Sequence, residues 1–585
     1  MRIASLVVLL SLAPTALAQP AFVNALTGTN DAIVEGVAVD NVGNVYVTGS
    51  FEGTIDLDAS DGPDADDSFT AFGLRQPNAF VASYTAAGAY RWGYGFGGAT
   101  SDAGNAIATD GARVYVVGGF RSSDGMDVDP GAGETRLMTN GGNDAFVVAY
   151  TASTGALEWA FNLGGVGADN VFSVATDGDR VYLGGAFEDP MDIDPGAGTT
   201  TLDGFTDQVN AFMVAYTADT GAFVWGHDFF GPAITQAFGI GTDGSGAYVT
   251  GALRGTADFD PGAGTVELTA STDAGGATAT EDVFVAAYDA SSGAYRWAHL
   301  ISGPNGQRGF AIDADGEQVY VGGGLAGSAD FDPGAGTATL ESSGVIKPFI
   351  AAYAASDGAY AWANLLDSTE RGSEQTNGVA VVGSRVYATG TIQGTVDFDP
   401  GAGTQELTTA GFADAFVVAY ATADGAYEDA GLISGTSNEQ GKGIAVSSTQ
   451  VTVGGRFSTL SGGSVDFDMG AGTEPRSSTG GFDGFIASYS IPEGVDAEES
   501  PARFASLSAF PNPGTRATVE LAVEAPASVT LTLYDALGRQ LEVVFEGDVV
   551  ESIQARLPVG LAPGVYVIRA SGEDVSETLR VTVLR

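Results

Sequence analysis

Short hydrophobic runs that alternate with small or polar positions recur along most of the chain. In Phe80-Val81-Ala82-Ser83-Tyr84, the first, third and fifth side chains fall on one face, which is the period of a β-strand. No helical periodicity competes with this pattern. The run occurs seven times, and its copies end at Tyr84, Tyr150, Tyr216, Tyr288, Tyr353, Tyr420 and Tyr489. The pattern therefore predicts an all-β chain made of repeats.

Three further strands are predicted in each repeat. A run such as Val45-Tyr46-Val47-Thr48 ends in a glycine, a shorter run precedes it, and a fourth run follows each tyrosine after a glycine turn. The repeats are about 65–72 residues long. Four short antiparallel strands repeated seven times predict a seven-bladed β-propeller over residues 19–490.

The two ends of the repeat array complement each other. The seventh repeat stops at Tyr489 after three strands, whereas residues 21–28 resemble the fourth strand of other repeats, such as residues 159–165. If this first strand completes the last blade, the ring closes and leaves no edge strand. We also expect the tryptophans of the fourth strands to pack as core against the next blade: Trp92, Trp159, Trp225, Trp297 and Trp362.

Composition and the N-terminus indicate an exported protein. Residues 1–18 have an arginine, an apolar run and an Ala-Leu-Ala end, which is typical of a signal peptide that is too short to span a membrane. The chain has a net charge of −50 and no cysteine. Such a charge disfavours nucleic acid and anionic membranes as partners. We expect a monomer that is not membrane-spanning and is secreted or attached to the outer cell surface.

A second domain follows the repeats. Residues 491–504 are acidic and bounded by prolines, as in a linker. Residues 505–585 alternate apolar and polar positions in several runs, which predicts a small Ig-like β-sandwich. Three motifs punctuate this domain, at Pro511-Asn512-Pro513, Tyr534–Arg539 and Leu561–Tyr566.

Both parts resemble known families. The repeat, with Phe-Val-Val-Ala-Tyr, Gly-Ala-Tyr-x-Trp and Val-Tyr-Val-x-Gly, resembles the bacterial seven-bladed β-propeller (SBBP) repeat, a family that implies a fold and no particular activity. The order of motifs in residues 505–585 resembles the C-terminal sorting domain of the type IX (Por) secretion system. That resemblance implies export across the outer membrane, with the type IX machinery as partner, followed by release or attachment at the surface.

An Asp-x-Asp motif follows the second strand of every repeat. Five copies extend to Asp-x-Asp-Pro-Gly-Ala-Gly. Two carboxylates at this spacing face one tight loop, and calcium takes about six to eight oxygens of this kind. We interpret these loops as structural calcium sites, to which Asp144, Asp282, Asp414 and Asp483 add oxygens. The predicted metal ligands are Asp127, Asp129, Asp192, Asp194, Asp258, Asp260, Asp330, Asp332, Asp397 and Asp399. The alternative is that the motif serves turn formation and solubility alone.

Little in the sequence indicates catalysis. The two histidines, His227 and His299, stand alone, and no nucleophile motif accompanies them. Near-identical acidic loops also argue against a single active site. We therefore expect a non-enzymatic binding or structural scaffold, with polysaccharide or surface proteins as partners. Two alternatives remain open: a propeller-type polysaccharide hydrolase or lyase, and an envelope protein without a specific ligand.

Overall fold

The structure is a computed structural model. It describes residues 19–491 except 59–66, 74–75, 123, 206–207, 233, 274, 277–278, 343–344, 369, 371, 373, 460–462 and 480. It also describes residues 504–583 except 511–517, 524–526, 536–538, 550–551, 559–560, 562–563 and 572–575. The predicted signal peptide, residues 492–503 of the predicted linker, and Pro511-Asn512-Pro513 lie outside the described residues. The chain divides into two compact units between Pro492 and Glu493.

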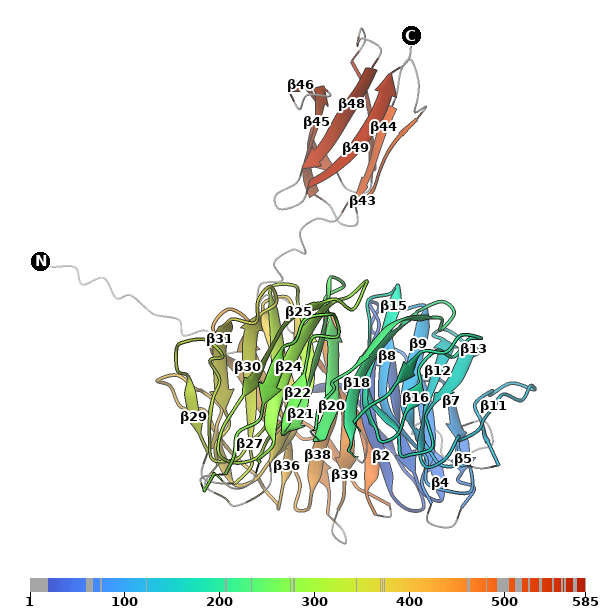
Figure 1. Ribbon diagram of the computed structural model, residues 1–585, viewed down its shortest axis with the longest axis vertical. Coiled ribbons are helices and arrows are strands. Elements are labelled where there is room, and N and C mark those ends of the chain that lie inside the picture. The colour runs from blue at the N-terminus through green and yellow to red at the C-terminus, as the bar shows by residue number, and fades with distance from the viewer. Residues whose placement is uncertain are drawn as a thin grey trace, which may run out of the picture. The chain divides into compact units, whose positions relative to one another are not determined.

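The described part of the first unit contains seven four-stranded antiparallel sheets, which we call blades 1 to 7 in chain order (Figure 1). The first strands of the blades are β2 (Ala32–Val39), β8 (Ala103–Thr109), β14 (Asn170–Thr176), β20 (Ile234–Thr242), β26 (Gln307–Ala314), β32 (Gln375–Val382) and β38 (Glu439–Val446). The second strands are β3 (Val45–Phe51), β9 (Arg113–Phe120), β15 (Arg180–Phe187), β21 (Gly246–Arg254), β27 (Gln318–Leu325), β33 (Arg385–Ile392) and β39 (Gln450–Phe457).

The outer half of each blade holds the tyrosine and tryptophan runs. The third strands are β6 (Asn78–Tyr84), β12 (Asp144–Thr151), β18 (Asn210–Thr217), β24 (Asp282–Asp289), β30 (Lys347–Ala354), β36 (Asp414–Ala421) and β42 (Asp483–Ser490). The fourth strands are β7 (Tyr90–Phe96), β13 (Leu157–Leu163), β19 (Phe223–Asp228), β25 (Tyr295–Ile301), β31 (Tyr360–Leu365), β37 (Tyr427–Ile433) and, in blade 7, β1 (Pro20–Leu26).

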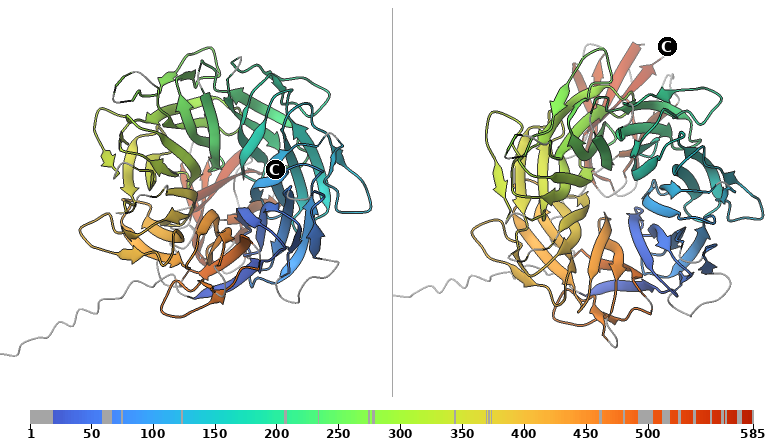
Figure 2. Two further views of the ribbon diagram at one scale, coloured as in Figure 1. Left: turned by 90° about the horizontal axis from the view of Figure 1, so that it is seen from below. Right: turned by 60° about the horizontal axis from the view of Figure 1, so that its bottom comes forward.

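The blades form a ring (Figure 2). Each first strand contacts the first strand of the next blade, and β2 contacts β38 in the same way. Strand β1 pairs antiparallel with β42, from Pro20 opposite Tyr489 to Leu26 opposite Gly484. The all-β propeller predicted from the sequence is confirmed.

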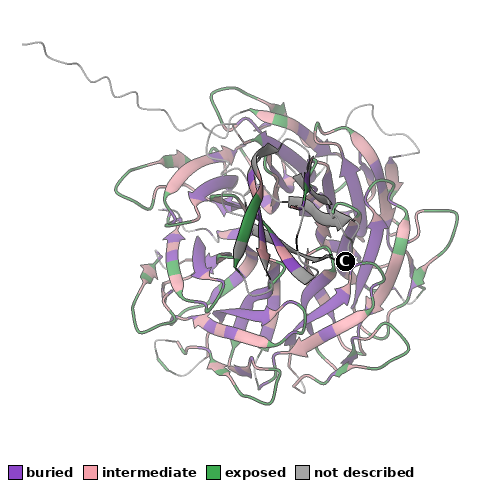
Figure 3. Cartoon of the chain, turned by 90° about the horizontal axis from the view of Figure 1, so that it is seen from above, coloured by how far each residue is buried: buried purple, intermediate pink, exposed green. Residues whose placement is uncertain are grey.

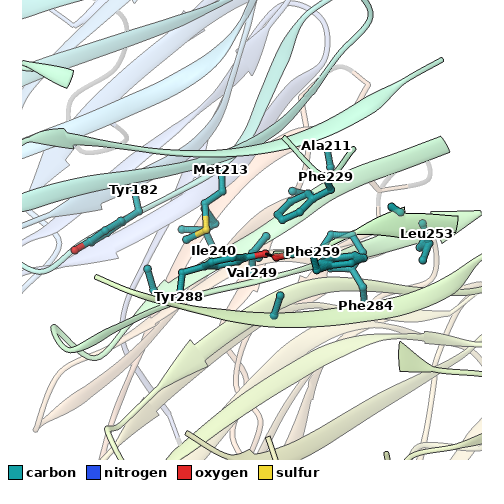
Figure 4. Packing of buried hydrophobic residues seen from close by; sticks show 14 of the residues in the cluster. Tyr182, Ala211, Met213, Phe229, Ile240, Val249, Leu253, Phe259, Phe284 and Tyr288 are labelled. Carbon is teal, nitrogen blue, oxygen red and sulfur yellow. Dashed lines mark hydrogen bonds between the residues drawn. The ribbon is translucent and has the colours of Figure 1, made fainter. Parts of the chain in front are cut away.

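The core lies between neighbouring blades, where the sheets stack face to face (Figure 3). One cluster joins Tyr182 and Met213 of blade 3 to Ile240, Val249 and Phe284 of blade 4, all at most 5% exposed (Figure 4). The tryptophans belong to this packing. Each one donates its indole N–H to a carbonyl of the next blade at 2.8–3.1 Å, which supports their prediction as core.

The second unit is a small β-sandwich. One sheet has the order β43-β44-β47 and the other β46-β45-β48-β49. Leu521 and Ala555 of the first sheet share a core with Leu531, Leu533 and Ile568 of the second. The strands are β43 (Phe504–Phe510), β44 (Thr518–Val523), β45 (Ala527–Asp535), β46 (Gln540–Val549), β47 (Ser552–Arg556), β48 (Gly564–Ser571) and β49 (Ser576–Val583).

Across the residues that the structure describes, no helix is both long and apolar enough to cross a membrane.

Candidate functional site

The Asp-x-Asp motifs lie on an extra hairpin that the sequence analysis did not predict. In every blade a two-stranded ribbon of two or three residues per strand connects the second and third strands. The ribbons are β4 (Thr54–Asp56) with β5 (Ser68–Thr70), β10 (Met126–Asp127) with β11 (Arg136–Leu137), β16 (Met191–Asp192) with β17 (Thr201–Leu202), β22 (Thr256–Asp258) with β23 (Glu267–Thr269), β28 (Ser328–Asp330) with β29 (Thr339–Glu341), β34 (Thr395–Asp397) with β35 (Glu406–Thr408), and β40 (Val465–Asp466) with β41 (Pro475–Arg476).

The first aspartate of the motif closes the hairpin loop. Oδ1 of Asp258 accepts hydrogen bonds from the amide of Asp260 at 3.0 Å and from that of Val266 at 2.8 Å. The equivalent pair of bonds, to the residues two and eight positions later, forms at Asp127, Asp192, Asp330, Asp397 and Asp466. This carboxylate therefore joins both sides of the loop.

The second aspartate holds the Pro-Gly turn. Oδ1 of Asp260 accepts the amide hydrogen of Gly262 at 2.8 Å, and its other oxygen lies where a β-carbon on Gly264 would stand. The same turn bond forms at Asp129, Asp194, Asp332, Asp399 and Asp468. The sequence Asp-Pro-Gly-Ala-Gly thus has a complete hydrogen-bonding explanation, since an Asx turn needs the carboxylate and the last glycine leaves room for it.

The residue between the two aspartates fixes the loop to the blade. Its side chain is buried, as in Phe331 at 1% exposed, and its carbonyl accepts a hydrogen bond from the tyrosine that ends the third strand. Tyr353 donates to Phe331 at 3.0 Å. The same bond, at 2.7–3.0 Å, forms from Tyr84, Tyr150, Tyr216, Tyr288, Tyr420 and Tyr489. The buried anchor leaves both carboxylates at least partly open to solvent in blades 2 to 6, whereas Asp56 and Asp468 of blades 1 and 7 are each only 6% exposed.

The hairpins also join neighbouring blades. The amide of Asp258 donates to Phe230, in the segment that leaves blade 3, at 2.9 Å, and the amide of Asp330 donates to Ser302 at 3.1 Å. In the last repeat, Ser434 and Asp466 exchange two such bonds. The Asp-x-Asp hairpins and the blade-to-blade segments consequently share one rim of the ring.

The position and burial of the Asp-x-Asp carboxylates limit how a calcium ion could be bound at these loops. The ten predicted ligands occur as five separate pairs, and nine of them are only partly buried, while Asp192 is exposed. No group of three or more acidic, histidine or cysteine side chains suited to a metal occurs among the described residues. A cation at one loop would have two carboxylates and would take its remaining oxygens from the main chain and water.

Asp144, Asp282, Asp414 and Asp483 do not supplement these loops. They begin the third strands, are fully buried, and accept hydrogen bonds from nearby groups, such as the Asn140 amide to Asp144 at 2.7 Å. The prediction that these four aspartates add oxygens to the calcium sites was wrong. The start of the third strand faces the junction with the next blade and not the Asp-x-Asp hairpin of its own blade.

Six of the seven junctions bury a polar pair that the sequence analysis missed, and the seventh buries a single polar side chain, that of Asp483. An equivalent backbone hydrogen bond crosses each of the seven junctions. An amide at or next to the start of one blade's first strand donates to a carbonyl of the preceding blade, at 2.7–3.1 Å, and the acceptor is the residue just before that blade's third strand. The side chains that meet there are at most 1% exposed: Asn78 and Asp102, Asp144 and Asp169, Asn210 and Thr235, Asp282 and Gln307, Lys347 and Glu374, Asp414 and Glu439, and Asp483 and Ala32. The polar residue two places before each F-x-x-x-Y phenylalanine was the available signal.

A second missed feature surrounds the axis of the ring. Every first strand has a β-bulge, and the extra residues are Glu35, Asn105, Phe172, Phe238, Phe310, Asn377 and Lys442. Phe238 lies 5.4 Å from Phe172 and 5.5 Å from Phe310 between ring centroids, and Lys442 pairs with Glu35 at 3.6 Å. The bulges thus add side-chain contacts between first strands of successive blades.

One cleft of about 430 Å³ opens on the hairpin rim between blades 1 and 2. Phe72, Asp127, Asp129 and Arg136 line it together with the glycine-rich segment 95–98. Phe72 is 73% exposed. With Asp124 the cleft has three carboxylates. These groups, an exposed aromatic ring and a guanidinium can bind a polar ligand that has an apolar face.

The histidines have structural surroundings. His227 stacks on Trp225 and His299 on Trp297, with ring centroids 5.2 and 5.3 Å apart. Burial lowers the pKa of both, that of His299 to about 3. His227 contacts the carbonyl of Gly293 at 2.7 Å. A histidine that stays neutral within an aromatic stack is poorly suited to proton transfer near neutral pH.

No protein-family model matches the chain, and no curated protein matches it. Among solved structures, it is similar to the quinohemoprotein alcohol dehydrogenase of Comamonas testosteroni, with 13% identity over 83% of this chain and 78% of that one, at a TM-score of 0.38. It is similar to a europium-containing methanol dehydrogenase at 12% identity, over 80% and 93% of the two chains and a TM-score of 0.35. A Pyrococcus horikoshii acylaminoacyl peptidase matches at 10% identity over 86% of this chain and 58% of that one, with a TM-score of 0.34. At these scores the likeness carries no argument about ligand or activity.

Proposed function

We propose that the chain is an exported, non-enzymatic propeller of the SBBP type that acts by binding at its hairpin rim. The observation that carries this proposal is the combination of partly open carboxylate pairs with exposed apolar side chains on that rim, concentrated in the cleft beside Phe72. The near-identity of the loops favours adhesion over catalysis, because an active site is ordinarily a single departure from a repeat. Its partner would be a polysaccharide or a protein of the cell surface.

Calcium is part of the proposal. The Asp-x-Asp loops would hold the ion through their paired carboxylates, with Asp258 and Asp260 as the model pair. Heating the chain in EDTA and then in calcium tests this, since a ligand that binds only the folded state raises the unfolding temperature. We expect a saturable rise that becomes smaller when both aspartates are replaced by asparagine. Equal melting of both chains at every calcium concentration would contradict loop binding.

The binding experiment uses a panel of immobilised polysaccharides and outer-surface proteins, in calcium and in EDTA. Phe72→Ser and Asp127→Asn should each weaken retention at least tenfold. Val42→Ser is the matched control, because Val42 is 70% exposed in the turn between first and second strands, at the opposite rim. Release of sugars from any polysaccharide, or equal loss in all three variants, would contradict the proposal.

We further propose that the second unit is a type IX sorting domain that delivers the propeller to the outer surface. The order of its three motifs supports this. Deleting residues 493–585 should leave the propeller in the periplasm of a type IX-competent host, whereas the full chain appears outside the cell. Export of the truncated chain would contradict the sorting function and would leave the binding proposal intact.

A further inference from the structure

The junction between blades 6 and 7 buries two acids. Asp414 and Glu439 are both 0% exposed. Neither Oε1 nor Oε2 of Glu439 has a hydrogen-bond partner, and Oδ1 of Asp414 has none either. Oδ2 of Asp414 accepts hydrogen bonds from the Ser434 hydroxyl and from the Ala410 amide at 3.0 Å. These three carboxylate oxygens are costly to bury, because they have lost water and only weak contacts replace it, from the Gly435 amide and between the two acids themselves.

The preceding junction shows what can fill the same place. Between blades 5 and 6, Lys347 occupies the position of Asp414 and Glu374 that of Glu439. Ser368 lies one residue beyond the strand-register counterpart of Ser434, but it likewise places a hydroxyl against the residue that begins the third strand. The backbone frame is the same, since Glu374 donates its amide to Ile346 at 3.1 Å and Glu439 donates to Ala413 at 2.8 Å. There the Lys347 ammonium bonds Oε1 of Glu374 at 2.6 Å, the Glu370 carbonyl at 2.7 Å and the Ser368 hydroxyl.

Junction 5/6 therefore has a positive charge, the ammonium of Lys347, opposite its glutamate. Junction 6/7 has a second carboxylate, that of Asp414, in the same place. The two ionised acids of junction 6/7 would have a charge of −2 with no nearby cation among the described contacts. Burial, followed by the charge of Asp414, raises the pKa of Glu439 to about 8. A shared proton would neutralise only one of the two groups.

We propose that junction 6/7 is a binding site for a divalent, oxygen-preferring cation of the calcium type, held by Asp414 and Glu439 with the Ser434 hydroxyl. Two carboxylates balance its charge, and hydroxyl and main-chain oxygens are ligands that such ions accept. Junction 2/3 also holds two acids, Asp144 and Asp169, but Asp169 accepts the amides of Gly165 at 2.6 Å and Glu188 at 3.4 Å, so that only Oδ1 of Asp144 lacks a hydrogen-bond partner there. This site is buried and separate from the Asp-x-Asp loops, so it does not depend on the proposed function.

The first experiment counts bound calcium by equilibrium dialysis of the full chain after EDTA treatment. Glu439→Gln and Asp414→Asn should each remove one equivalent. Asp144→Asn in junction 2/3 is the control that should keep it. The loss caused by Glu439→Gln should recur in a chain that already carries Asp397→Asn and Asp399→Asn, so that any calcium in the neighbouring loop is counted separately. Unchanged stoichiometry in both junction variants overturns the proposal.

The second experiment converts one junction into the other. Asp414→Lys places an ammonium opposite Glu439, as Lys347 stands opposite Glu374. We expect this variant to lose the same equivalent of calcium and to melt, without calcium, at or above the temperature of the EDTA-treated parent chain. Retention of that equivalent with a lysine in the site would overturn the proposal.

Discussion

Junctions 5/6 and 6/7 use the same backbone frame for opposite electrostatic solutions. In the first, Lys347 and Glu374 form an ion pair at 2.6 Å with both side chains 0% exposed. In the second, Asp414 and Glu439 bring together two groups of the same charge. The propeller tolerates either arrangement because the strands and the amide hydrogen bond across each junction fix the backbone frame. The side chains then decide how each junction responds to pH, ions and mutation.

The largest effect is expected when the ion pair loses its lysine. Lys347→Met leaves Glu374 buried without its partner and should lower the free energy of unfolding by about 3–5 kcal/mol. Urea unfolding of the full chain measures this loss. The double variant Lys347→Met with Glu374→Leu should recover most of the stability, because two apolar side chains remove the stranded charge. Equal losses in the single and double variants would contradict the assigned cost.

The acid pair should make stability depend on pH in the opposite sense to a carboxylate that is paired with a cation. Glu439 keeps its proton in the folded chain up to about pH 8, whereas the unfolded chain loses it near pH 4.5. Without divalent ions, stability should therefore fall as pH rises between these values, by at most about 1.4 kcal/mol per pH unit.

Comparison with a Glu439 variant isolates this group from pH 6 to pH 8, because the two histidines, whose pKa is lowered by burial, add a slope of opposite sign near pH 6.5 in both chains. Burial also raises the pKa of Asp169 and Asp313, each to about 6, so these residues add the same slope as Glu439 mainly at lower pH. Glu439→Gln should flatten the curve in the upper window, as thermal or urea unfolding can measure. Parallel curves for the parent chain and the variant from pH 6 to pH 8 would show that Glu439 does not titrate there.

The serine hydroxyls of the two junctions allow a finer comparison. Ser434→Ala removes a hydroxyl donor from the carboxylate of Asp414 and should cost about 2 kcal/mol. Ser368→Ala should cost only about 1 kcal/mol, because the Lys347 ammonium still reaches Glu374 and the Glu370 carbonyl. Urea unfolding at pH 7 should rank the two variants in this order, and the reverse order would contradict the assigned roles.

The smallest effect is expected at an exposed counterpart of the buried pair. Arg308 pairs with Glu281 at 2.6 Å across junction 4/5, but their side chains are 47% and 28% exposed. Arg308→Gln should change the free energy of unfolding by no more than about 0.5–1 kcal/mol, and added salt should abolish the difference. The loss in Lys347→Met should persist at the same salt concentration. A salt-resistant effect at Arg308 would contradict the dependence on burial.

The strands were predictable because their cause is local. The period of two in Phe80–Tyr84 and its copies reflects side chains that point to alternate faces of a strand. The same pattern showed that β1 resembles the fourth strands of the other blades. The Asp-x-Asp hairpins were not predicted, because strands of two or three residues are too short to show alternation of apolar and polar positions. Without the return strand, nothing indicated that Asp258 would accept the amide of Val266.

The junction pairs could not be deduced from spacing alone. Glu439 meets Asp414 across a blade boundary, so the partner is set by how two sheets stack and not by any neighbour in sequence. The acids at 144, 282, 414 and 483 were visible as a repeated feature. Their assignment to the wrong loop followed from treating each repeat as self-contained, whereas every blade is completed by the one beside it.

The register of β1 against β42 has a mechanical consequence. Pro20 lies opposite Tyr489, so the chain before β1 and the chain after β42 leave from the same end of the pair. Tension applied through these two segments would load the strand bonds one after another, as in a zipper, and would not shear them all at once. The blade that completes the ring is therefore the one that opens at the lowest pulling force, and stretching a single molecule from its two ends should peel away β1 before any other strand of the propeller.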